Sequence, residues 1–395
     1  MTVERLGPKL FNWASILEEK TREQAVRTSQ MPFISPHLAL MPDAHLGKGA
    51  TVGSVIPTLR AIIPAAVGVD IGCGMIAVRT QWTETDVRAA GPLAELRVAI
   101  ERAIPLSAGG YNSEERTTES VVAERLEVLA QKAAKAGFDP SSYTGNWTRQ
   151  LGSLGSGNHF IEVTADQSGT VWLFLHSGSR GIGNRIAQKH IKVARALMEK
   201  YYITLPDLDL AYLVQDTAEF WSYINEMRWA QDFALANREE MMHRLMQCTA
   251  AFMGEPVQDL ERINCHHNFT QPEHHFGKDV WVSRKGAIQA DAGRPGLIPG
   301  SMGTASYVVT GKGNPLSLNS SPHGAGREFS RTAARKKFTV EDLREAMKGI
   351  EYRDTDAFVD EIPGAYKPID QVMADAADLV EVQHTLHQIL NVKGD

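Results

Sequence analysis

The chain has 395 residues, of which 43% are hydrophobic and 22% are charged, and its formal net charge at pH 7 is −6. This composition is typical of a globular protein with enough apolar material for a large core. The acidic balance excludes a globally basic nucleic-acid binder, so an anionic partner would need a local basic surface. Three cysteines without framework spacing indicate a reducing, cytoplasmic compartment. The sequence shows no signal pattern and no apolar run of about 18 residues, which predicts neither export nor a membrane span.

No linker or charge block divides the chain, so we expect one domain over residues 1–395. Its N-terminal part is predicted to hold a helix over Glu18–Ser29 and a strand over Thr51–Pro57. Before that strand, Asp43 and His45 stand at a glycine-rich turn. They are equally compatible with a carboxylate behind a metal site, a phosphate-binding loop or a plain turn.

A short buried strand is predicted over residues 62–67, and a loop with Asp70 and Cys73 follows it. Glycines on both sides let the backbone turn tightly and approach a bound ion or phosphate. A carboxylate oxygen and a thiolate sulfur three residues apart favour a borderline divalent ion such as Mn²⁺, Fe²⁺ or Zn²⁺ over Mg²⁺ or Ca²⁺. The alternative is a glycine-rich turn with a buried, unreactive cysteine.

Two helical regions and a second glycine-rich loop are predicted in the middle of the chain. Residues 84–104 and 114–137 have the apolar period of helices. The loop from Gly152 to Gly157 exposes successive backbone N–H groups, which suit phosphate, but it matches neither the P-loop nor the dinucleotide fingerprint. The next strand begins with an amide, an imidazole and a carboxylate, at Asn158, His159 and Glu162. A lone histidine at such a place can also be a hydrogen-bonded residue of the strand edge.

Two further strands are predicted to end in a histidine. The first ends in His176, and a serine- and glycine-rich loop with Arg180 leads from it to a helix that begins at about Asn184. Such a loop at a helix entrance suits phosphate. Two long helices are expected over 207–251, with their aromatic and methionine side chains in the core, and the second strand-like segment then ends in His267.

The C-terminal part contains a histidine between proline and glycine and a basic segment. His323 lies in a run of small residues, which predicts an accessible loop. The segment after it places Arg327, Arg331 and Arg335 at i, i+4 and i+8, on one face of a predicted helix. They would form either a solvated face or a track for phosphates. A last helix is expected over Ile369–Leu390.

The candidate metal ligands share one position, the end of an apolar strand or a glycine-rich strand edge. They are Asp70, Cys73, His159, His176 and His267. One shared cluster explains them more simply than five coincidences, and two cations could share the Cys73 thiolate. A two-metal site suits in-line displacement at phosphorus because it stabilises both the entering and the leaving oxygen. His323 remains as a nucleophile, since a neutral imidazole can attack the α-phosphorus of a nucleoside triphosphate and form a phosphoramidate.

The motifs that contain these residues resemble those of the RtcB family of RNA-splicing ligases, in its bacterial branch. The matching stretches run from about Pro42 to Gly394 and are MPDAHLGKGATVGSVIPT, IIPAAVGVDIGCGM, LGSLGSGNHFIEV, LHSGSRGIGN, INCHHN, RKGAI, IPGSMG, HGAGR-x-x-SR, AYK-x-ID and VKG. One departure is Pro322, where a small polar residue or cysteine is expected before the histidine. The resemblance implies the family's α+β fold, with mixed and antiparallel sheets, surrounding helices and a metal centre in a deep cleft.

The resemblance also implies a role for each candidate residue. Two Mn²⁺ ions would be held by Asp70, Cys73, His159, His176 and His267, and His323 would become guanylylated. The GMP part of GTP would bind at Asn158, His159, Phe160, Ile161, Glu162, His267, Asn268, Pro299, Gly300, Ser301, Met302, Ser306, His323, Gly324, Ala325, Gly326, Tyr366 and Lys393. Asp43 matches an acidic residue near the metal site. Composition alone would instead place Lys393 at a solvated terminus.

The implied reaction joins RNA 3′-phosphate or 2′,3′-cyclic phosphate ends to 5′-hydroxyl ends. GTP guanylylates His323, water opens a cyclic end to a 3′-phosphate, and the 3′-phosphate takes GMP from the histidine. The 5′-hydroxyl then attacks this activated end and GMP leaves. The resemblance leaves open whether an activating protein is a further partner, and it implies no membrane.

Two other functions would use the same residues differently. A dinuclear metallophosphoesterase that acts on cyclic phosphate ends of RNA without GTP would need the five ligands, but it would leave His323 and Lys393 unexplained. A non-catalytic RNA-binding module would bind RNA without metal and without Cys73.

Overall fold

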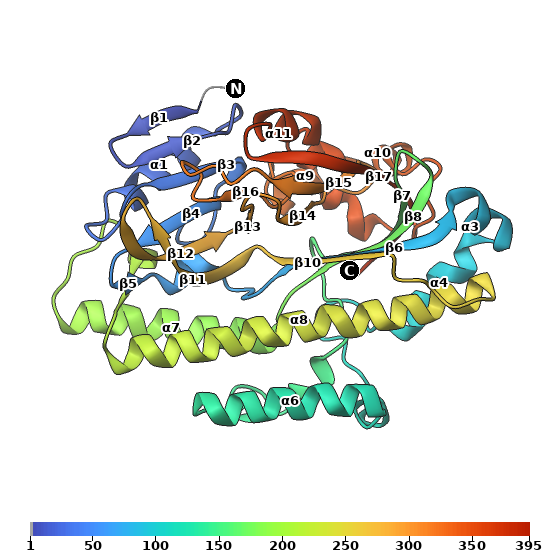
Figure 1. The fold of residues 1–395 in the computed structure, drawn as a ribbon, viewed down its shortest axis with the longest axis horizontal. Coiled ribbons are helices and arrows are strands. Elements are labelled where there is room, and N and C mark those ends of the chain that lie inside the picture. Colours follow the sequence, from blue (N-terminus) through green and yellow to red (C-terminus); the bar gives the residue numbers. More distant parts are fainter. Residues whose placement is uncertain (1–2) are drawn as a thin grey trace.

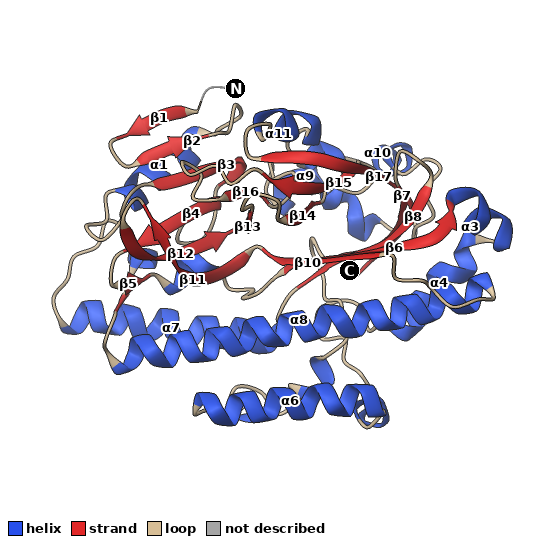
Figure 2. Ribbon diagram, viewed as in Figure 1, coloured by secondary structure: helices blue, strands red, loops and turns tan. Residues whose placement is uncertain are grey.

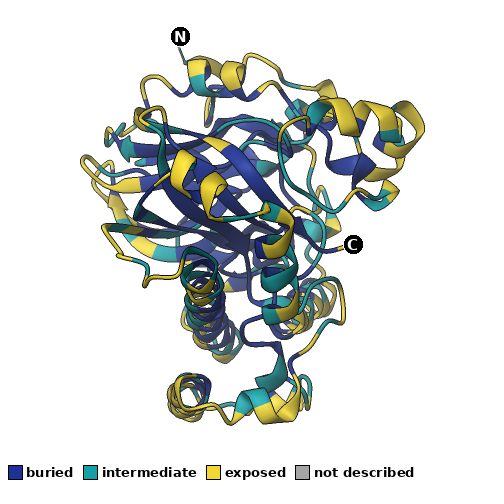
Figure 3. Ribbon diagram, turned by 90° about the vertical axis from the view of Figure 1, so that its right-hand side faces the viewer, coloured by how far each residue is buried: buried dark blue, intermediate teal, exposed yellow. Residues whose placement is uncertain are grey.

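Strands fill the middle of the molecule and helices surround them in the computed structural model, which describes residues 3–395 (Figure 1). The longest helices lie together along one side of the sheets (Figure 2). The strands are mostly buried, whereas the outlying helix at the bottom of the view is largely exposed (Figure 3). The predicted α+β class is therefore confirmed. Among the described residues, no helix is both long and apolar enough to span a bilayer.

The first large sheet has six strands in the order β1-β2-β3-β4-β12-β11. All neighbouring pairs are antiparallel except β2 and β3, which run parallel. The strands are β1 (Glu4–Gly7), β2 (Leu10–Asn12), β3 (Leu38–His45), β4 (Val52–Thr58), β11 (Asn268–His275) and β12 (Lys278–Lys285).

The second large sheet has seven strands in the order β10-β6-β8-β7-β17-β15-β14, and all of its pairs are antiparallel. The strands are β6 (Gly74–Thr83), β7 (Phe160–Ala165), β8 (Thr170–Ser177), β10 (Glu261–His266), β14 (Pro295–Ile298), β15 (Ser306–Gly311) and β17 (Val380–Lys393). Two small sheets pair β13 (Ala287–Gln289) with β16 (Ser320–Pro322) and β5 (Ala61–Ile62) with β9 (Leu213–Val214).

Two long helices, α7 (Arg180–Lys200) and α8 (Ala218–Met253), pack against each other beneath the sheets, and α6 (Ser120–Ala136) packs on α8 (Figure 1). The shorter α-helices are α1 (Glu19–Ser29), α2 (Pro64–Val67), α3 (Glu84–Ala90), α4 (Leu93–Ala103), α5 (Glu114–Thr117), α9 (Arg331–Lys337), α10 (Val340–Ala346) and α11 (Ile369–Asp375). Short 3₁₀ helices cover Pro140–Ser142, Thr148–Gln150, Leu208–Leu210, Asp356–Glu361 and Pro363–Ala365.

Strand β8 shows why the second sheet lies between two cores. Trp172 and Phe174 pack into one hydrophobic cluster, whereas Leu173 and Leu175 pack into another. Successive side chains of a strand point to opposite faces of a sheet, so an uninterrupted apolar run is buried on both sides. Packing on both faces therefore fixes the position of β8. His176, which follows the apolar run in this strand, is fixed by the same packing.

Several predicted elements are confirmed, and others are wrong. The helix expected over Glu18–Ser29 is α1, and the strand expected over Thr51–Pro57 is β4. The strand expected over 62–67 is mostly helix α2, because Pro64 suits the first position of a helix. Asp43 and His45 end strand β3, at an irregularity in its pairing with β4, and do not form a turn.

The remaining errors concern the long elements. Helix α7 begins at Arg180, so Asn184 lies within it and does not cap it. Residues 207–251 do not form two helices: α8 is one helix of 36 residues, which Thr217 caps, and neither proline nor glycine interrupts it. Of the helix expected over Ile369–Leu390, only α11 (Ile369–Asp375) forms. Strand β17 follows it, because the backbone groups of that segment pair with β7 and β15.

Candidate metal centre and nucleotide pocket

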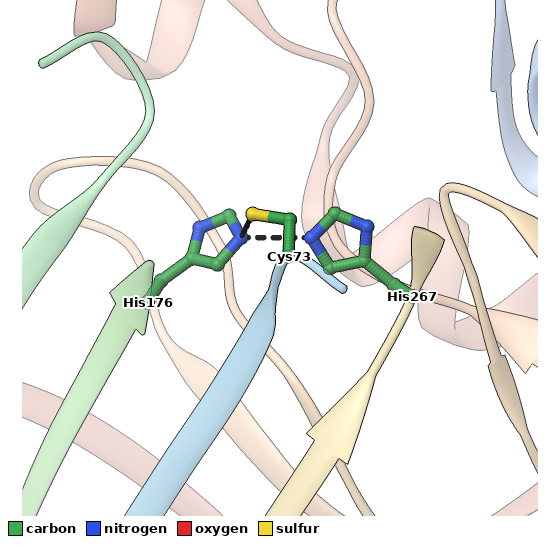
Figure 4. A group of neighbouring side chains, drawn as sticks. All are labelled: Cys73, His176 and His267. Atoms are coloured by element: carbon green, nitrogen blue, oxygen red, sulfur yellow. Dashed lines mark hydrogen bonds between the residues drawn. The ribbon is translucent and has the colours of Figure 1, made fainter. Parts of the chain in front are cut away.

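Three ligand candidates meet where neighbouring strands of the second sheet end (Figure 4). Cys73 directly precedes β6, His176 lies near the end of β8, and His267 follows β10. Because β6 pairs with both β8 and β10, the antiparallel register brings these ends together. The Cys73 Sγ lies 3.3 Å from the His176 Nε2, which lies 2.8 Å from the His267 Nε2.

A second group shares the same cysteine. The His159 Nε2 lies 3.4 Å from the Cys73 Sγ and 3.1 Å from the Asp70 Oδ2. Within each group, the ligand atoms all lie within 4.8 Å of one another. The five predicted ligands therefore form two adjoining groups of three, Cys73 with His176 and His267 and Cys73 with Asp70 and His159, and the thiolate could bridge two cations.

Each histidine of the cluster is held by its other ring nitrogen. The Nδ1 atoms lie 2.9 to 3.2 Å from carbonyl oxygens, those of Leu154 for His159, Asn158 for His176 and the Asn268 side chain for His267. A carbonyl oxygen can only accept, so each Nδ1 carries the proton and each Nε2 presents a lone pair. Two lone pairs that face each other repel, so a cation between the rings would stabilise this arrangement.

Burial affects the ionisation of the cluster. It lowers the pKa of His176 and His267 well below the usual range, which keeps both rings neutral and able to bind metal. Burial raises the pKa of the Cys73 thiol, and the Asp70 charge raises it further. A divalent cation would offset the cost of a buried thiolate. One thiolate, three imidazoles and one carboxylate fit a borderline ion such as Mn²⁺ or Zn²⁺.

The glycines of the two predicted phosphate loops are needed for close approach. A Cβ atom on Gly178 would overlap the Asp70 carboxylate, and one on Gly155 would overlap the Arg180 guanidinium. The Ser179 N–H donates to the Asp70 Oδ1 at 3.0 Å. These loops therefore fix a metal-ligand candidate and an arginine at the edge of the centre.

His323 lies beside the metal-ligand candidates and is held by Asp43. Its Nδ1 lies 2.6 Å from the Asp43 Oδ2, and its backbone N–H donates to the same oxygen at 3.2 Å. Asp43 is fully buried, and a carboxylate can only accept, so in a neutral His323 ring this contact places the proton on Nδ1 and leaves Nε2 with a lone pair. The His323 and His267 ring centroids are 4.5 Å apart.

The accessible loop predicted around His323 is wrong, because the residue is only 9% exposed and follows β16. Pro322 ends that strand, opposite Ala287 of β13. Proline therefore lies within a two-stranded pairing directly before the histidine, and its missing N–H leaves the contact of His323 with Asp43 intact.

A cavity of about 370 Å³ adjoins the centre. It is lined by three ligand candidates, Asp70, His176 and His267, and by His323. The predicted nucleotide residues that also line it are Asn158, Phe160, Glu162, Asn268, Pro299, Gly300, Ser301, Met302, Gly324, Ala325, Gly326, Tyr366 and Lys393. The other predicted nucleotide residues do not line it: His159 belongs to the metal-ligand group, Ile161 packs in the core, and Ser306 accepts a hydrogen bond from the Gly300 N–H through its hydroxyl.

A buried carboxylate and a buried amine, Glu162 and Lys393, both line the cavity. The Glu162 Oε1 accepts from the Asn391 side chain at 3.0 Å, whereas its Oε2 has no partner. Burial raises the pKa of Glu162 to about 8, although Lys393 opposes the shift. Lys393 is itself buried, not at a solvated terminus, and its Nζ lies 3.4 Å from the Glu361 Oε2.

The three arginines of the predicted basic face form ion pairs with two buried carboxylates. Arg327 and Arg331 pair with Glu361, and Arg331 and Arg335 pair with Asp360. Arg327 precedes α9, so the prediction of one shared helix face is wrong. Their charge is largely compensated within the protein, which weakens the hypothesis of a phosphate track at this place.

Several residues of the cavity were not predicted from the sequence. Lys48, Lys285, Glu361 and Asn391 all line it. Asn391 could have been predicted, because it stands two residues before the candidate Lys393. In a strand, residues two apart lie on the same face. Glu361 could not have been predicted, since it reaches the cavity only through the packing of a 3₁₀ helix.

The family profile that matches this chain and the related proteins that resemble it carry the same family name. The profile of the family described as "tRNA-splicing ligase RtcB" matches residues 24–394. The chain is 47% identical to RNA-splicing ligase RtcB1 of Escherichia coli strain ATCC 25922 and 46% identical to RNA-splicing ligase RtcB of Escherichia coli K12, in each case over 100% of this chain and 99% of the relative. It is 32% identical to tRNA-splicing ligase RtcB of Thermococcus kodakarensis, over 90% of this chain and 87% of the relative.

Proposed function

The chain belongs to the RtcB family of RNA ligases, and we propose that residues 1–395 act as one catalytic domain that joins RNA 3′-phosphate or 2′,3′-cyclic phosphate ends to 5′-hydroxyl ends with GTP and Mn²⁺. The observation that carries the proposal is the position of His323, which lies against two ligand groups that share Cys73. A bare imidazole beside a two-cation site is suited to nucleotidyl transfer.

In this proposal, Asp70, Cys73, His159, His176 and His267 hold two Mn²⁺ ions. When bound, the ions stabilise negative charge on the phosphoryl oxygens. The thiolate and carboxylate give the site a net negative charge that attracts the cations. The three Nδ1–H bonds to carbonyl oxygens keep the ligand rings oriented.

His323 acts as the nucleophile through its Nε2. This atom attacks the α-phosphorus of GTP, a bond from nitrogen to phosphorus forms, and pyrophosphate leaves. The ring becomes positively charged, and the Asp43 carboxylate stabilises that charge through the Nδ1–H. An oxygen of the RNA 3′-phosphate then attacks the same phosphorus and His323 leaves. Finally the 5′-hydroxyl attacks the RNA phosphorus, the phosphodiester forms, and GMP leaves.

Glu162 and Lys393 select guanine in this proposal. A carboxylate accepts from the N1–H and the exocyclic amine of guanine, and an ammonium donates to its O6, so this pair of lining residues complements the base. Adenine has no N1–H, so it would leave the Glu162 Oε2 without that donor, which is costly in a buried site. The unpartnered Glu162 Oε2 is the observation that supports this orientation.

The test of the proposed function is incubation of the purified protein with GTP labelled at the α-phosphate and Mn²⁺. We expect a covalent, acid-labile label on His323 and joining of a 3′-phosphate end to a 5′-hydroxyl end. A metallophosphoesterase would open a cyclic phosphate end in the absence of GTP and acquire no label. That result would replace the ligase proposal with the alternative.

GTP affinity is expected to rise with pH up to about 8. With the pKa of Glu162 raised to about 8 in the free protein, the carboxylate is protonated at lower pH and must lose its proton before it can accept from guanine. Each pH unit below that value should weaken binding by up to about tenfold. Calorimetric titration with GTP at several pH values measures this dependence. Glu162→Gln, which cannot ionise, should bind more weakly with a flat profile. Equal slopes in the two proteins would contradict the role of Glu162.

A further inference from the structure

Two neighbouring residues of helix α8, Asn237 and Arg238, are polar and fully buried. They lie near the middle of the helix, which packs against β6 and β8 (Figure 1). Cys73 directly precedes the first of these strands, and His176 lies near the end of the second. Burial of an amide or a guanidinium is costly unless its polar atoms are hydrogen-bonded. The partners of these two side chains therefore indicate which parts of the chain they hold.

The Arg238 guanidinium contacts three residues that each adjoin a metal-ligand candidate. Its Nη1 donates to the Gly72 oxygen at 2.8 Å and to the Ser177 oxygen at 3.1 Å, and its Nη2 lies 3.1 Å from the His266 Nδ1. Its Nε donates to the Asn264 side chain at 2.9 Å. Among the described residues, no carboxylate forms an ion pair with Arg238, so these contacts must offset its burial. The adjoining candidates form the first ligand group, which is Cys73, His176 and His267.

Asn237 connects two of the glycine-rich loops. Its side-chain oxygen accepts from the N–H groups of Gly152 and Ser153, at 2.7 and 3.2 Å. Its Nδ2 donates to the backbone oxygens of Ser153 and Gly178, both at 3.1 Å. One amide therefore fixes the distance between the loop that precedes β7 and the loop that follows β8.

These two loops support the rest of the metal-ligand candidates. In the first loop, the Leu154 oxygen accepts from the His159 Nδ1–H at 2.9 Å. In the second loop, the Ser179 N–H donates to the Asp70 Oδ1 at 3.0 Å. His159 and Asp70 form the second ligand group together with Cys73. Each member of the buried pair on α8 is thus linked to a different ligand group.

We propose that Arg238 positions the first ligand group and that Asn237 positions the second, so that the metal-free protein already holds its ligands close to the arrangement that binds cations. The inference rests on the metal site of the proposed function, and it adds two residues that do not line the cavity. A guanidinium suits this role because its N–H groups point in fixed directions and can bind several acceptors at once. Ligands that are held in place lose little conformational freedom when a cation binds, which raises the affinity.

Cobalt binding to the metal-free protein tests the two assignments separately. Co²⁺ is the probe because its bond to a thiolate absorbs light, so that one titration reports both the affinity and the geometry of the ligands. Asp70→Asn leaves only the first ligand group complete, and His267→Ala leaves only the second. These two proteins are the backgrounds in which the residues of α8 are then replaced.

Each substitution should act mainly on its own ligand group. In the Asp70→Asn protein, Arg238→Met should weaken Co²⁺ binding about 10- to 100-fold and shift the absorption band. In the His267→Ala protein, Asn237→Ala should have an effect of the same size. Each substitution should have a smaller effect in the other background, because the two groups share only Cys73.

Two further variants separate positioning from a general loss of stability. Arg244→Met removes another buried arginine of α8, which pairs with Glu240 and has no partner next to the first ligand group. In the Asp70→Asn protein it should lower Tm and leave Co²⁺ binding unchanged. Arg238→Lys keeps the charge and the apolar stem, and it replaces Arg238→Met if that variant does not fold. It should also weaken Co²⁺ binding, since one ammonium nitrogen cannot reach all the partners of the guanidinium.

The outcomes distinguish this proposal from the proposed function. Unchanged Co²⁺ binding in a folded Arg238 variant, or an equal loss with Arg244→Met, would overturn the role of Arg238. Unchanged binding with Asn237→Ala would overturn the role of Asn237. An unmodified protein without thiolate absorption in the presence of Co²⁺ would refute the metal site itself. The titration needs neither GTP nor RNA, so it decides the positioning role even if the ligase chemistry fails.

Discussion

Replacing Cys73 with alanine is expected to abolish both the transfer of GMP to His323 and the sealing of RNA ends. The thiolate belongs to both ligand groups, so its loss weakens both cation sites at once. Removal of a residue that only supports a metal ligand typically costs 10- to 100-fold, so loss of a shared ligand should exceed about 100-fold. Metal content by mass spectrometry and the rates of the two half-reactions measure the effect.

Cys248→Ala is the matched control. Cys248 lies in α8 and packs beside a hydrophobic cluster, away from the two ligand groups. Its substitution should leave metal content and both half-reactions close to those of the unmodified protein. If the two alanine variants lost activity to the same extent, the assignment of Cys73 to the metal site would be wrong.

His323→Ala is expected to lose the covalent GMP adduct and to keep metal binding. The five ligand candidates remain in place, whereas the nitrogen that we propose as the nucleophile is gone. The variant should still seal an RNA that carries a chemically made 3′-guanylyl diphosphate end, because this substrate enters after the histidine step. The rate of adduct formation should fall below detection, and gel analysis of the adduct and of the sealed product separates the two half-reactions.

His176→Ala and His267→Ala provide the contrast. Both should fail with the pre-activated RNA, since the sealing step still needs cations to stabilise charge at phosphorus. A His323→Ala protein with normal metal content that could not seal this RNA would show that His323 does more than carry GMP. Metal content, adduct formation and sealing, measured in the three variants, together distinguish a nucleophile from a residue that only shapes its surroundings.

The cluster could be predicted from the sequence because its signals are local. Cys73, His176 and His267 each stand at the end of an apolar run, and such runs identify strands from a few neighbouring residues. Glycine-rich loops can also be recognised from a few neighbouring residues, and at Gly178 the missing side chain lets the Asp70 carboxylate lie against the backbone. The order of the strands could not be predicted from the sequence. Strand β6 pairs with both β8 and β10, and this pairing brings Cys73, His176 and His267 together in one site.

The remaining features depend on contacts between distant parts of the chain. Residues 380–393 have a helix-compatible composition, yet they form β17 because two partner strands supply hydrogen bonds on both of its sides. The same pairing turns Lys393 from an expected solvated residue into a buried one. Glu361 and Asp360 lie in a turn without any motif, and their importance appears only when the arginines reach them.

The central position of β17 has a consequence for synthesis on the ribosome. It lies between β7 and β15, and its partner residues in β7 precede it by 222 positions at His387 and Ala165 and by 233 at Lys393 and Phe160. At 5–20 residues per second, roughly 10 to 40 seconds pass between the emergence of the two strands. During that time the edge of β7 is unpaired and can recruit another nascent chain. The proposed nucleotide site must also wait, because Glu162 and Lys393 meet only when β17 is inserted. Chaperone demand should therefore be highest late in translation, and catalytic competence should arise in the last step of folding.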